Sequence, residues 1–380
     1  MNSPTQPVEH LVHLMHSLEV GGLEQVVLSL IRRARAEGLD HSIVVCDHAF
    51  RDATLDFDPG DLPVTLISRG PGLDWSFVRR LRKHLRQVGA QVVHAHNDTP
   101  IVYGALAGMQ PFGKPPGLIG TFHNMPHCGG TLARRMTRWA SGRARGLTSV
   151  SEELGQRIST QGWSVPPTVL ENGVDLDRYQ PEGPNGQWRE RSQVADGEIL
   201  VGMLARHVPV KRQADLLAAA KLLHEQGRPV HTLFVGQGPD REAFVSHSQA
   251  TPGVTCLLPT PHVPDLLRAL DIFVLCSDHE AMPLALMEAM AAGRACIVTQ
   301  VGGMPDLISG PDGPVACMVP PRDPNALAEA IARLASDPAL RTKLGGLARN
   351  RAASFAFDKR WPDYLRLWAR ATGHQHGESP

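Results

Sequence analysis

Short apolar segments alternate with amphipathic segments along almost the whole chain, and this alternation restricts the possible folds more than any other feature of the sequence. The apolar segments are nearly unbroken, which is typical of strands buried on both faces of a sheet. Several segments between them carry apolar residues at helical spacing. The alternation therefore predicts an α/β fold whose parallel sheets are covered by helices on both faces.

The predicted strands form two series, each with its own helices. The first series has strands at 11–15, 43–46, 64–67, 92–95, 118–122, 148–150 and 169–170, with helices at 23–36, 75–87 and 132–140. The second has strands at 200–204, 232–235, 254–258, 272–275 and 296–299, with helices at 211–226, 264–269, 283–291 and 324–335.

A stretch without apolar periodicity, rich in proline and glycine, separates the two series. At about 150 residues per domain, a chain of 380 residues also favours two domains. Two doubly wound domains would face a central cleft at the carboxyl ends of their strands, where such folds bind ligands. The predicted boundaries are an N-terminal domain (1–178), a linker (179–197), a C-terminal domain (198–356) and a final segment (357–380), in which a helix packs back on the N-terminal domain and a disordered tail follows.

Charge and cysteine content narrow the function classes. The 38 basic and 38 acidic side chains cancel, so no overall field attracts nucleic acid. Six cysteines occur without a C-x-x-C pair, a pattern that indicates a reducing compartment rather than a disulfide framework. The sequence shows neither a signal peptide nor the roughly 20 apolar residues of a membrane-spanning helix. We therefore expect a cytoplasmic protein.

The first candidate binding feature is the pair Gly21-Gly22, which follows the first strand and opens a helix. Glycines let the backbone approach a ligand closely, and a helix N-terminus favours phosphate, although an ordinary strand–helix turn would look the same. No glycine stands three residues further on, and Arg241 occupies that position after Gly236-Gln237-Gly238. Both strings therefore fail the dinucleotide fingerprint, and a nicotinamide dehydrogenase is disfavoured.

Two cations, Arg206 and Lys211, follow the strand that opens the second series. At the carboxyl end of a strand they could neutralise a diphosphate leaving group, or they could be solvated surface charges.

Glu280 and Glu288 are separated by seven residues in the most distinctive segment of the sequence. Glu280 lies in the loop after a predicted strand, and Glu288 lies within an apolar helix that Gly293 ends. A carboxylate in apolar surroundings needs a partner, and the hydroxyl groups of a sugar or ribose would serve. A surface loop acid and a helix-face acid are the alternative interpretation.

This segment resembles the E-x7-E signature of retaining glycosyltransferases of the family 4 type, which have the GT-B fold of two Rossmann-like domains. Further similarities occur in the family's order over residues 11–355: Gly21–Glu24, Gly120–Asn124, Ser149–Ser151, Glu171–Asp175, Arg206 to Lys211, Val235–Gly238, Val301–Asp306 and Val319–Pro321.

The resemblance implies a role for each matching residue of the donor site. Glu288 would bind the ribose hydroxyls of the nucleotide and Glu280 hydroxyls of the donor sugar. Arg206 and Lys211 would hold the diphosphate, and Gly22 would approach it from the N-terminal, acceptor-binding domain. His123 would contact the transferred sugar near the reacting carbon.

Backbone groups complete the implied donor site. The amides of Met282 and Leu284 are candidates for sugar and phosphate contacts, whereas Pro283 has no N–H to offer. Backbone atoms near Gly236–Gly238 and at Pro261–Val263 would contact the base.

The sequence departs from the family pattern at three positions. Ala281 stands where glycine is most often found, which could change donor choice or weaken the site. Asp306 replaces the common glutamate, a milder change. Arg212 follows Lys211 where glycine is common.

We expect no metal or other cofactor, because Arg206 and Lys211 already supply the charge that a metal would bring to the diphosphate. The D-x-D strings at 56–58 and 175–177 are taken as structural. His94 and His96 are expected on opposite faces of a strand, without a third ligand. His96 and Asn97 fit better as cleft-lining groups that bind the acceptor.

Two segments without acidic residues, 79–86 and 99–151, carry clustered arginine and lysine. Such a surface could hold the first domain on an anionic membrane at roughly 1 kcal/mol per well-placed cation, or these could be two solvated helix faces. Many relatives act on lipid-linked acceptors, which favours peripheral contact with the inner face of the cytoplasmic membrane.

Together these features predict a retaining, metal-independent hexosyltransferase that moves a sugar from a nucleoside-diphosphate sugar to an acceptor hydroxyl in cell-surface polysaccharide or glycolipid synthesis. Two alternatives stay open: a nucleotide-sugar epimerase or hydrolase of the same fold, and a non-catalytic nucleotide-sugar-binding subunit. Turnover with an acceptor distinguishes the transferase from both.

Overall fold

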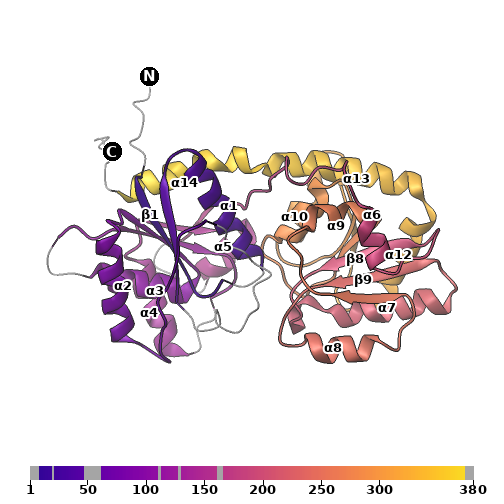
Figure 1. Cartoon of the computed structure of the whole chain (residues 1–380), viewed down its shortest axis with the longest axis horizontal. Coiled ribbons are helices and arrows are strands. Elements are labelled where there is room, and N and C mark those ends of the chain that lie inside the picture. Colours follow the sequence, from indigo (N-terminus) through magenta and orange to yellow (C-terminus); the bar gives the residue numbers. More distant parts are fainter. Residues whose placement is uncertain are drawn as a thin grey trace, which may run out of the picture. The chain divides into compact units, whose positions relative to one another are not determined.

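The structure is a computed structural model that describes residues 8–18, 21–46, 61–109, 113–126, 130–160 and 166–372. The chain divides into two compact units, Met1–Glu171 with Arg360–Pro380 and Asn172–Lys359. Each unit contains a parallel sheet with helices, which confirms the predicted α/β fold class (Figure 1).

The first unit is built on a seven-stranded parallel sheet in the order β3-β2-β1-β4-β5-β6-β7. Its strands are β1 (His10–Met15), β2 (Asp40–Val45), β3 (Val64–Leu66), β4 (Val92–His96), β5 (Gly117–Phe122), β6 (Gly146–Ser149) and β7 (Thr168–Val169). The central strands are buried along their whole length, as expected when helices cover both faces of a parallel sheet.

Two helices of this unit, at 98–108 and 152–160, were not predicted from the sequence. The helices of the unit are α1 (Gly22–Ala36), α2 (Trp75–Gln87), α3 (Asp98–Gly108), α4 (Thr131–Ser141) and α5 (Glu152–Thr160). Helix α3 is apolar on all sides and almost wholly buried, so it shows no amphipathic stripe.

The last helix, α14 (Phe357–Ala371), packs on the first sheet although it follows the second unit in the chain. The indole N–H of Trp368 donates to Nδ1 of His94 at 3.2 Å, and the Arg145 guanidinium donates to the carbonyl of Ala371 at 2.7 Å. A Cβ atom at Gly117 would lie 2.0 Å from that carbonyl oxygen, so only glycine permits this approach.

The second unit has a six-stranded parallel sheet in the order β10-β9-β8-β11-β12-β15. Its strands are β8 (Ile199–Leu204), β9 (Val230–Val235), β10 (Val254–Leu257), β11 (Ile272–Leu275), β12 (Ala295–Thr299) and β15 (Cys317–Val319), with a small hairpin of β13 (Ser309–Gly310) and β14 (Gly313–Pro314). Its α-helices are α6 (Gly186–Arg191), α7 (Gln213–Glu225), α8 (Arg241–Ser248), α9 (Val263–Ala269), α10 (Leu284–Ala291), α11 (Met304–Leu307), α12 (Pro324–Ser336) and α13 (Pro338–Ala352).

The segment expected to be a linker is an integral part of the second unit. It contains α6, and the side chains of Tyr179 and Trp188 within it are buried. The guanidinium of Arg189 pairs with Asp271 at 2.9 Å. These contacts hold the segment in place although its apolar residues have no regular spacing. A search of the sequence for such spacing therefore does not detect that the segment is folded.

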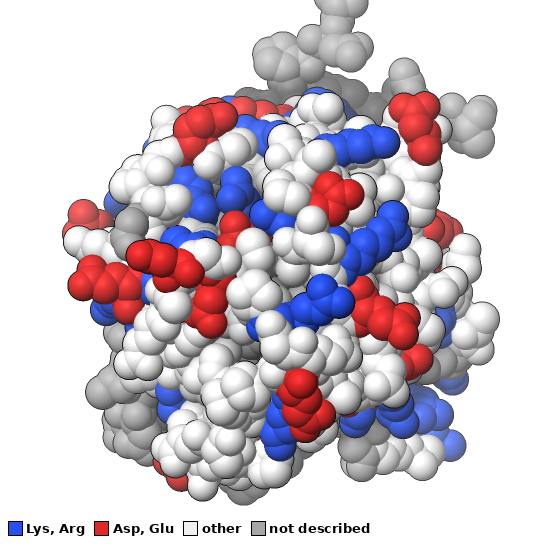
Figure 2. All heavy atoms as spheres, turned by 90° about the vertical axis from the view of Figure 1, so that its right-hand side faces the viewer, with Lys and Arg blue, Asp and Glu red and all other residues white. Residues whose placement is uncertain are grey.

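The surface of the second unit carries charges of both signs (Figure 2), in keeping with the equal numbers of basic and acidic residues in the sequence. Figure 2 shows a face on which basic and acidic side chains are interspersed. Within the ranges that the structure describes, no helix has the length and apolar character needed to cross a membrane.

Burial raises the pKa of the Cys276 thiol to about 12, which keeps it protonated. Cys128, Asp56, Asp58 and the tail from Gly373 lie outside the described residues.

Candidate active site

In the second unit, the carboxyl ends of β8 and β11 bring Lys211 and Glu280 together. The Lys211 ammonium lies 2.6 Å from Oε1 of Glu280, and the Ser277 hydroxyl donates to the same oxygen at 2.6 Å. Thr299 fixes this arrangement from the end of β12, where its hydroxyl donates to the Ser277 carbonyl at 2.7 Å. The structure thus joins a cation and a carboxylate that are 69 residues apart in the chain.

Gly302 and Gly303 shape the loop that carries Glu280. The amide of Gly303 donates to the Glu280 carbonyl at 2.9 Å. Gly302 has a φ of +52°, and a Cβ atom there would lie 1.9 Å from the same carbonyl oxygen. Any other residue would move the loop. Ala281, which replaces the family's common glycine, is buried at 4% exposure.

Met282 is tied to the first residue of this unit. The side-chain amide of Asn172 donates to the Met282 carbonyl at 3.2 Å, and the backbone amide of Asn172 lies 3.1 Å from the Met282 sulfur. Helix α10 then begins at Leu284, directly after Pro283.

Arg206 lies in a loop that the glycines after β9 support. A Cβ atom at Gly236 would lie 1.9 Å from the Ala205 carbonyl oxygen, and one at Gly238 would lie 2.4 Å from that of His207. Both glycines therefore allow the loops after β8 and β9 to touch. The side-chain amide of Gln213 donates to the Arg206 carbonyl at 2.7 Å, while the Arg206 side chain is exposed.

Arg212 explains one departure from the family pattern. Its backbone is left-handed, with φ +56° and ψ +38°, a conformation that glycine adopts without strain. The guanidinium makes two bonds to the Asp215 carboxylate, at 2.7 and 3.0 Å. A similar bidentate pair joins Arg322 to Asp278 at 2.9 Å. Neither pair was predicted from the sequence.

Glu288 is buried in the second turn of α10, at 9% exposure. The hydroxyl of Tyr179 donates to its Oε1 atom at 2.6 Å. Burial raises the pKa of Glu288 to about 7, while the Tyr179 bond and the charge of Arg178 act in the opposite direction. Tyr179 lies in the segment predicted to be a linker and was not predicted to belong to the site.

Val263 begins α9 and is half-buried. Asp175 forms a turn in which its Oδ1 atom accepts from the amides of Asp177 and Arg178, each at 3.0 Å. This turn supports the structural interpretation of the second D-x-D string.

In the first unit, His123 follows β5 and is held by Asn97. The amide of His123 donates to Oδ1 of Asn97 at 2.8 Å, and the amide of Asn97 donates to the Thr121 carbonyl at 2.8 Å. Burial lowers the pKa of His123 to about 3, so its ring is neutral at pH 7. Gly21 and Gly22 begin α1, and the Gly21 carbonyl accepts from Gln25 at 3.2 Å.

His123 ends a row of buried histidines that was not foreseen. Nδ1 of His13 lies 3.1 Å from Nε2 of His96, and Nδ1 of His96 lies 3.1 Å from Nε2 of His123. The expectation that His94 and His96 face opposite ways is wrong, since their ring centroids are 4.3 Å apart. Residues i and i+2 of a strand lie on the same face. His41 completes the row beside His13 and Trp368.

His13, His94 and His96 are close enough to be considered as metal ligands, because one nitrogen of each lies within 4.8 Å of the others. His13 is the third histidine that the sequence analysis did not find. His94 Nε2 lies 2.7 Å from the Thr121 hydroxyl, and its Nδ1 accepts from Trp368. Within this trio, Nε2 of His13 alone lacks a partner. The residues therefore fit a hydrogen-bonded row better than a metal centre.

Comparisons with known proteins identify the family and the fold of this chain. Residues 20–178 match the family model described as Glycosyltransferase Family 4, and residues 198–337 match that described as Glycosyl transferases group 1. The chain is 28% identical over 320 residues to the glycosyltransferase EpsF of Bacillus subtilis, covering 79% of this chain and 80% of EpsF. It is 28% identical over 217 residues to the 2-deoxystreptamine glucosyltransferase of Streptomyces kanamyceticus, covering 55% of this chain and 56% of that protein.

Solved structures show the same fold. Anabaena HepE in complex with UDP and glucose has a TM-score of 0.80 at 19% identity, over 94% of this chain and 98% of that one. Sucrose-phosphate synthase of Thermosynechococcus elongatus has a TM-score of 0.77 at 18% identity, over 96% of this chain and all of that one. The chain therefore belongs to the glycosyltransferases of the family 4 and group 1 type and has the GT-B fold.

Proposed function

We propose that this chain is a retaining hexosyltransferase that moves a sugar from a nucleoside-diphosphate sugar to an acceptor hydroxyl. The observation that carries the proposal is the set of charges in the second unit: Lys211 bound to Glu280, Arg206 on the adjoining loop, and the buried carboxylate of Glu288. A solved neighbour, HepE, is described in complex with UDP-glucose, which supports a donor of this class.

The cations stabilise the leaving diphosphate. Arg206 and Lys211 bring two positive charges to the carboxyl edge of the sheet, and charge-assisted bonds to phosphate are roughly twice as strong as neutral ones. Glu280 holds Lys211 in place and offers its other oxygen to hydroxyl groups of the donor sugar. In this proposal the reaction needs no metal, so activity persists in EDTA.

Around the nucleotide, Glu288 accepts from the ribose hydroxyls. The amides of Met282 and Leu284 contact the sugar and phosphates, and the loops at Gly236, Gly238 and Val263 contact the base.

His123 orients the transferred sugar as a neutral imidazole, which can donate one hydrogen bond and accept one. The acceptor-binding role expected for His96 and Asn97 stays a prediction. Both ring nitrogens of His96 have hydrogen-bond partners and the residue is 1% exposed, so in this proposal it also supports His123. The role expected for Gly21-Gly22, contact with the donor diphosphate, stays a prediction.

Calorimetric titration with UDP, GDP and ADP, and then with their sugar conjugates, tests the donor site. We expect one nucleotide to bind the wild type and to lose at least tenfold in affinity in Glu288→Ala. Glu225→Ala, which changes an exposed glutamate of α7, is the matched control and keeps wild-type affinity. A panel in which Glu288→Ala binds the nucleotide as well as the wild type refutes the site.

Turnover tests the reaction itself. Release of nucleoside diphosphate that depends on an acceptor distinguishes a transferase from a hydrolase and from a binding subunit. NMR of the anomeric centre in the product then checks retention. A relative that is 29% identical over 254 residues, TuaC of Bacillus subtilis, is named as a teichuronic acid biosynthesis glycosyltransferase, which supports a role in cell-surface polysaccharide synthesis.

We also propose that the first unit contacts an anionic membrane, as a cytoplasmic protein at the inner membrane face would. Helices α2 and α4 contain no acidic residue. Trp75 and Leu132, in their first turns, are 59% and 72% exposed. Exposed apolar side chains beside arginines are typical of interfacial helices. Both helices belong to the basic segments identified in the sequence.

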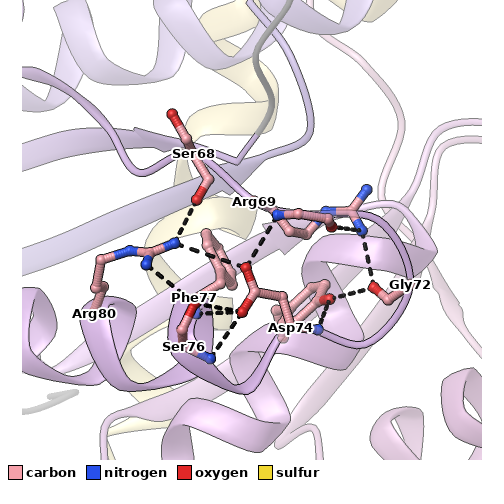
Figure 3. Close-up of polar contacts among 9 residues, drawn as sticks. Ser68, Arg69, Gly72, Asp74, Ser76, Phe77 and Arg80 are labelled. Atoms are coloured by element: carbon pink, nitrogen blue, oxygen red, sulfur yellow. Dashed lines mark hydrogen bonds and ion pairs between the residues drawn. The ribbon is translucent and has the colours of Figure 1, made fainter.

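A network of bonds around Asp74 holds the start of α2, where Trp75 is the first residue (Figure 3). The carboxylate of Asp74 accepts from the amides of Ser76 and Phe77 at 2.8 and 3.0 Å. Arg80 donates to the Ser68 carbonyl at 2.6 Å and to the Ser76 hydroxyl at 3.1 Å. The turn therefore presents its exposed tryptophan on a rigid base.

Sedimentation with vesicles tests this contact. We expect binding to vesicles that contain phosphatidylglycerol, and not to pure phosphatidylcholine. The double variant Arg79→Gln, Lys83→Gln weakens binding, whereas Arg228→Gln in the second unit leaves it unchanged; all three side chains are exposed. Equal sedimentation of all proteins with both vesicles excludes an electrostatic membrane site.

A further inference from the structure

Glu288 occupies a position where a carboxylate is costly. It lies within α10 between buried apolar residues, and 9% of its surface is exposed. Burial penalises its charged form, which is the form that accepts hydrogen bonds from two hydroxyl groups. An ionised Glu288 therefore needs compensation from a neighbouring group.

Tyr179 supplies a hydrogen bond to the carboxylate. Its hydroxyl lies 2.6 Å from Oε1 of Glu288, a length typical of a bond to a charged acceptor. Burial and the nearby charge of Glu288 raise the pKa of Tyr179 well above its usual value, so its hydroxyl keeps its proton and remains a donor. The bond fixes one oxygen of the carboxylate and thereby its plane.

Tyr179 is itself held on both sides. Arg349, on α13, donates to the carbonyls of Tyr179 at 2.8 Å, of Leu176 at 3.2 Å and of Ala291 at the end of α10. The amide of Tyr179 donates to the Asp175 carbonyl at 3.1 Å. One guanidinium therefore ties the segment that carries Tyr179 to the helix that carries Glu288.

The charged groups around this pair are few. The Arg178 guanidinium carbon lies 5.5 Å from the centre of the Tyr179 ring, and its charge favours ionised Glu288. Asp175 acts on Tyr179 rather than on Glu288, and Arg349 reaches the backbone carbonyls. The hydroxyl of Tyr179 is the hydrogen-bond donor that the structure records on the carboxylate.

We propose that Tyr179 is a positioning residue for donor binding: its hydroxyl holds the Glu288 carboxylate in one orientation and in its charged form, ready to accept the two hydroxyl groups of a nucleotide ribose. This inference rests on the proposed donor site. Tyr179 does not touch the nucleotide, and acts through Glu288 alone.

The test is nucleotide binding as a function of pH in Tyr179→Phe. A hydrogen bond to a charged group contributes roughly 1.5–3 kcal/mol, so its loss shifts the titration of Glu288 upward by about one to two pH units. We expect Tyr179→Phe to bind UDP about tenfold more weakly than the wild type at pH 7.0 and to approach wild-type affinity at pH 8.5. Tyr103→Phe, which removes another buried tyrosine hydroxyl in the first unit, keeps wild-type binding at each pH.

Two results would overturn the proposal. An equal loss of affinity at every pH from 6.0 to 8.5 would assign Tyr179 a purely structural role, because such a role does not titrate. Unchanged affinity at pH 7.0 would show that Glu288 needs no donor.

Stability measurements separate this inference from the donor site. If the wild type binds none of UDP, GDP and ADP, the donor site fails, but the tyrosine–carboxylate bond still predicts a pH-dependent loss. Urea unfolding of Tyr179→Phe should show a larger deficit at pH 8.5, where Glu288 is charged, than at pH 5.0, where it is protonated. A deficit that is the same at both pH values refutes the proposal without reference to any nucleotide.

Discussion

Acid should destabilise the first unit more than the second, because five histidines are buried there without charge. These are His13, His41, His94, His96 and His123, all with pKa values lowered chiefly by burial. A group whose pKa is lower in the folded than in the unfolded state binds a proton on unfolding. Stability is therefore complete above the unfolded pKa of about 6.5 and is lost as the pH falls below it.

The magnitude follows from the buried pKa values. For His41, with a pKa of about 4, lowering the pH from 7.5 to 5.5 removes about 1.3 kcal/mol of folding free energy. Five such residues would together remove at most about 7 kcal/mol, comparable with the whole stability of many domains. The second unit has two buried histidines with lowered pKa values, His207 and His231, so its loss is smaller.

Hydrogen exchange with mass spectrometry can follow the two units separately. After correction for the intrinsic pH dependence of exchange, peptides of β1, β4 and β5 should lose more protection between pH 7.5 and 5.5 than peptides of β8, β11 and β12. The variant His41→Met should reduce the loss in the first unit by about 1.3 kcal/mol, since neither ring nitrogen of His41 has a partner.

His262→Gln, at a histidine whose side chain is 68% exposed, is the control and should leave both units unchanged. Equal losses of protection in the two units, with no effect of His41→Met, would refute the argument from buried neutral histidines.

Three further predictions concern the second unit. Gly302→Ala should displace the Glu280 loop, because its Cβ atom cannot fit 1.9 Å from a carbonyl oxygen, and should weaken nucleotide binding in calorimetry while Gly346→Ala, at an open position, does not. Arg212→Gly should change the unfolding free energy by less than about 1 kcal/mol, since relief of the left-handed strain offsets the lost pair with Asp215. Arg212→Ala should lower the unfolding free energy by more. Urea unfolding in which the glycine variant is the less stable of the two would contradict this explanation. Ser277→Ala should reduce turnover by leaving Glu280 with Lys211 as its remaining recorded partner, and activity equal to wild type would show that the hydroxyl is dispensable.

The strands were predictable because burial on both faces leaves unbroken apolar runs. Strands such as β4 and β11 begin at the predicted residue. Helix α3 was not predicted, because a helix buried on all sides has no stripe to detect. Strand β15 is only three residues long and half-exposed, so it lacks the apolar run on which the prediction depended.

The candidate site was predictable only where one local motif contains it. Glu280 and Glu288 are close in the sequence, but the bond between Tyr179 and Glu288 joins residues 109 positions apart. The histidine row depends on sheet order: β1 lies beside β4, and β4 beside β5, so His13 meets His96 although 83 residues separate them. Neither contact leaves a pattern in a single sequence.

The position of α14 has a consequence for the order in which the protein is made. Helix α14 is synthesised after the whole of the second unit, yet it packs on the first unit. Until then, His94 lacks the indole of Trp368, and the face of the sheet at Gly117 is uncovered. The second unit can therefore complete its fold before the first, and a premature stop between the second unit and α14 would damage the first unit.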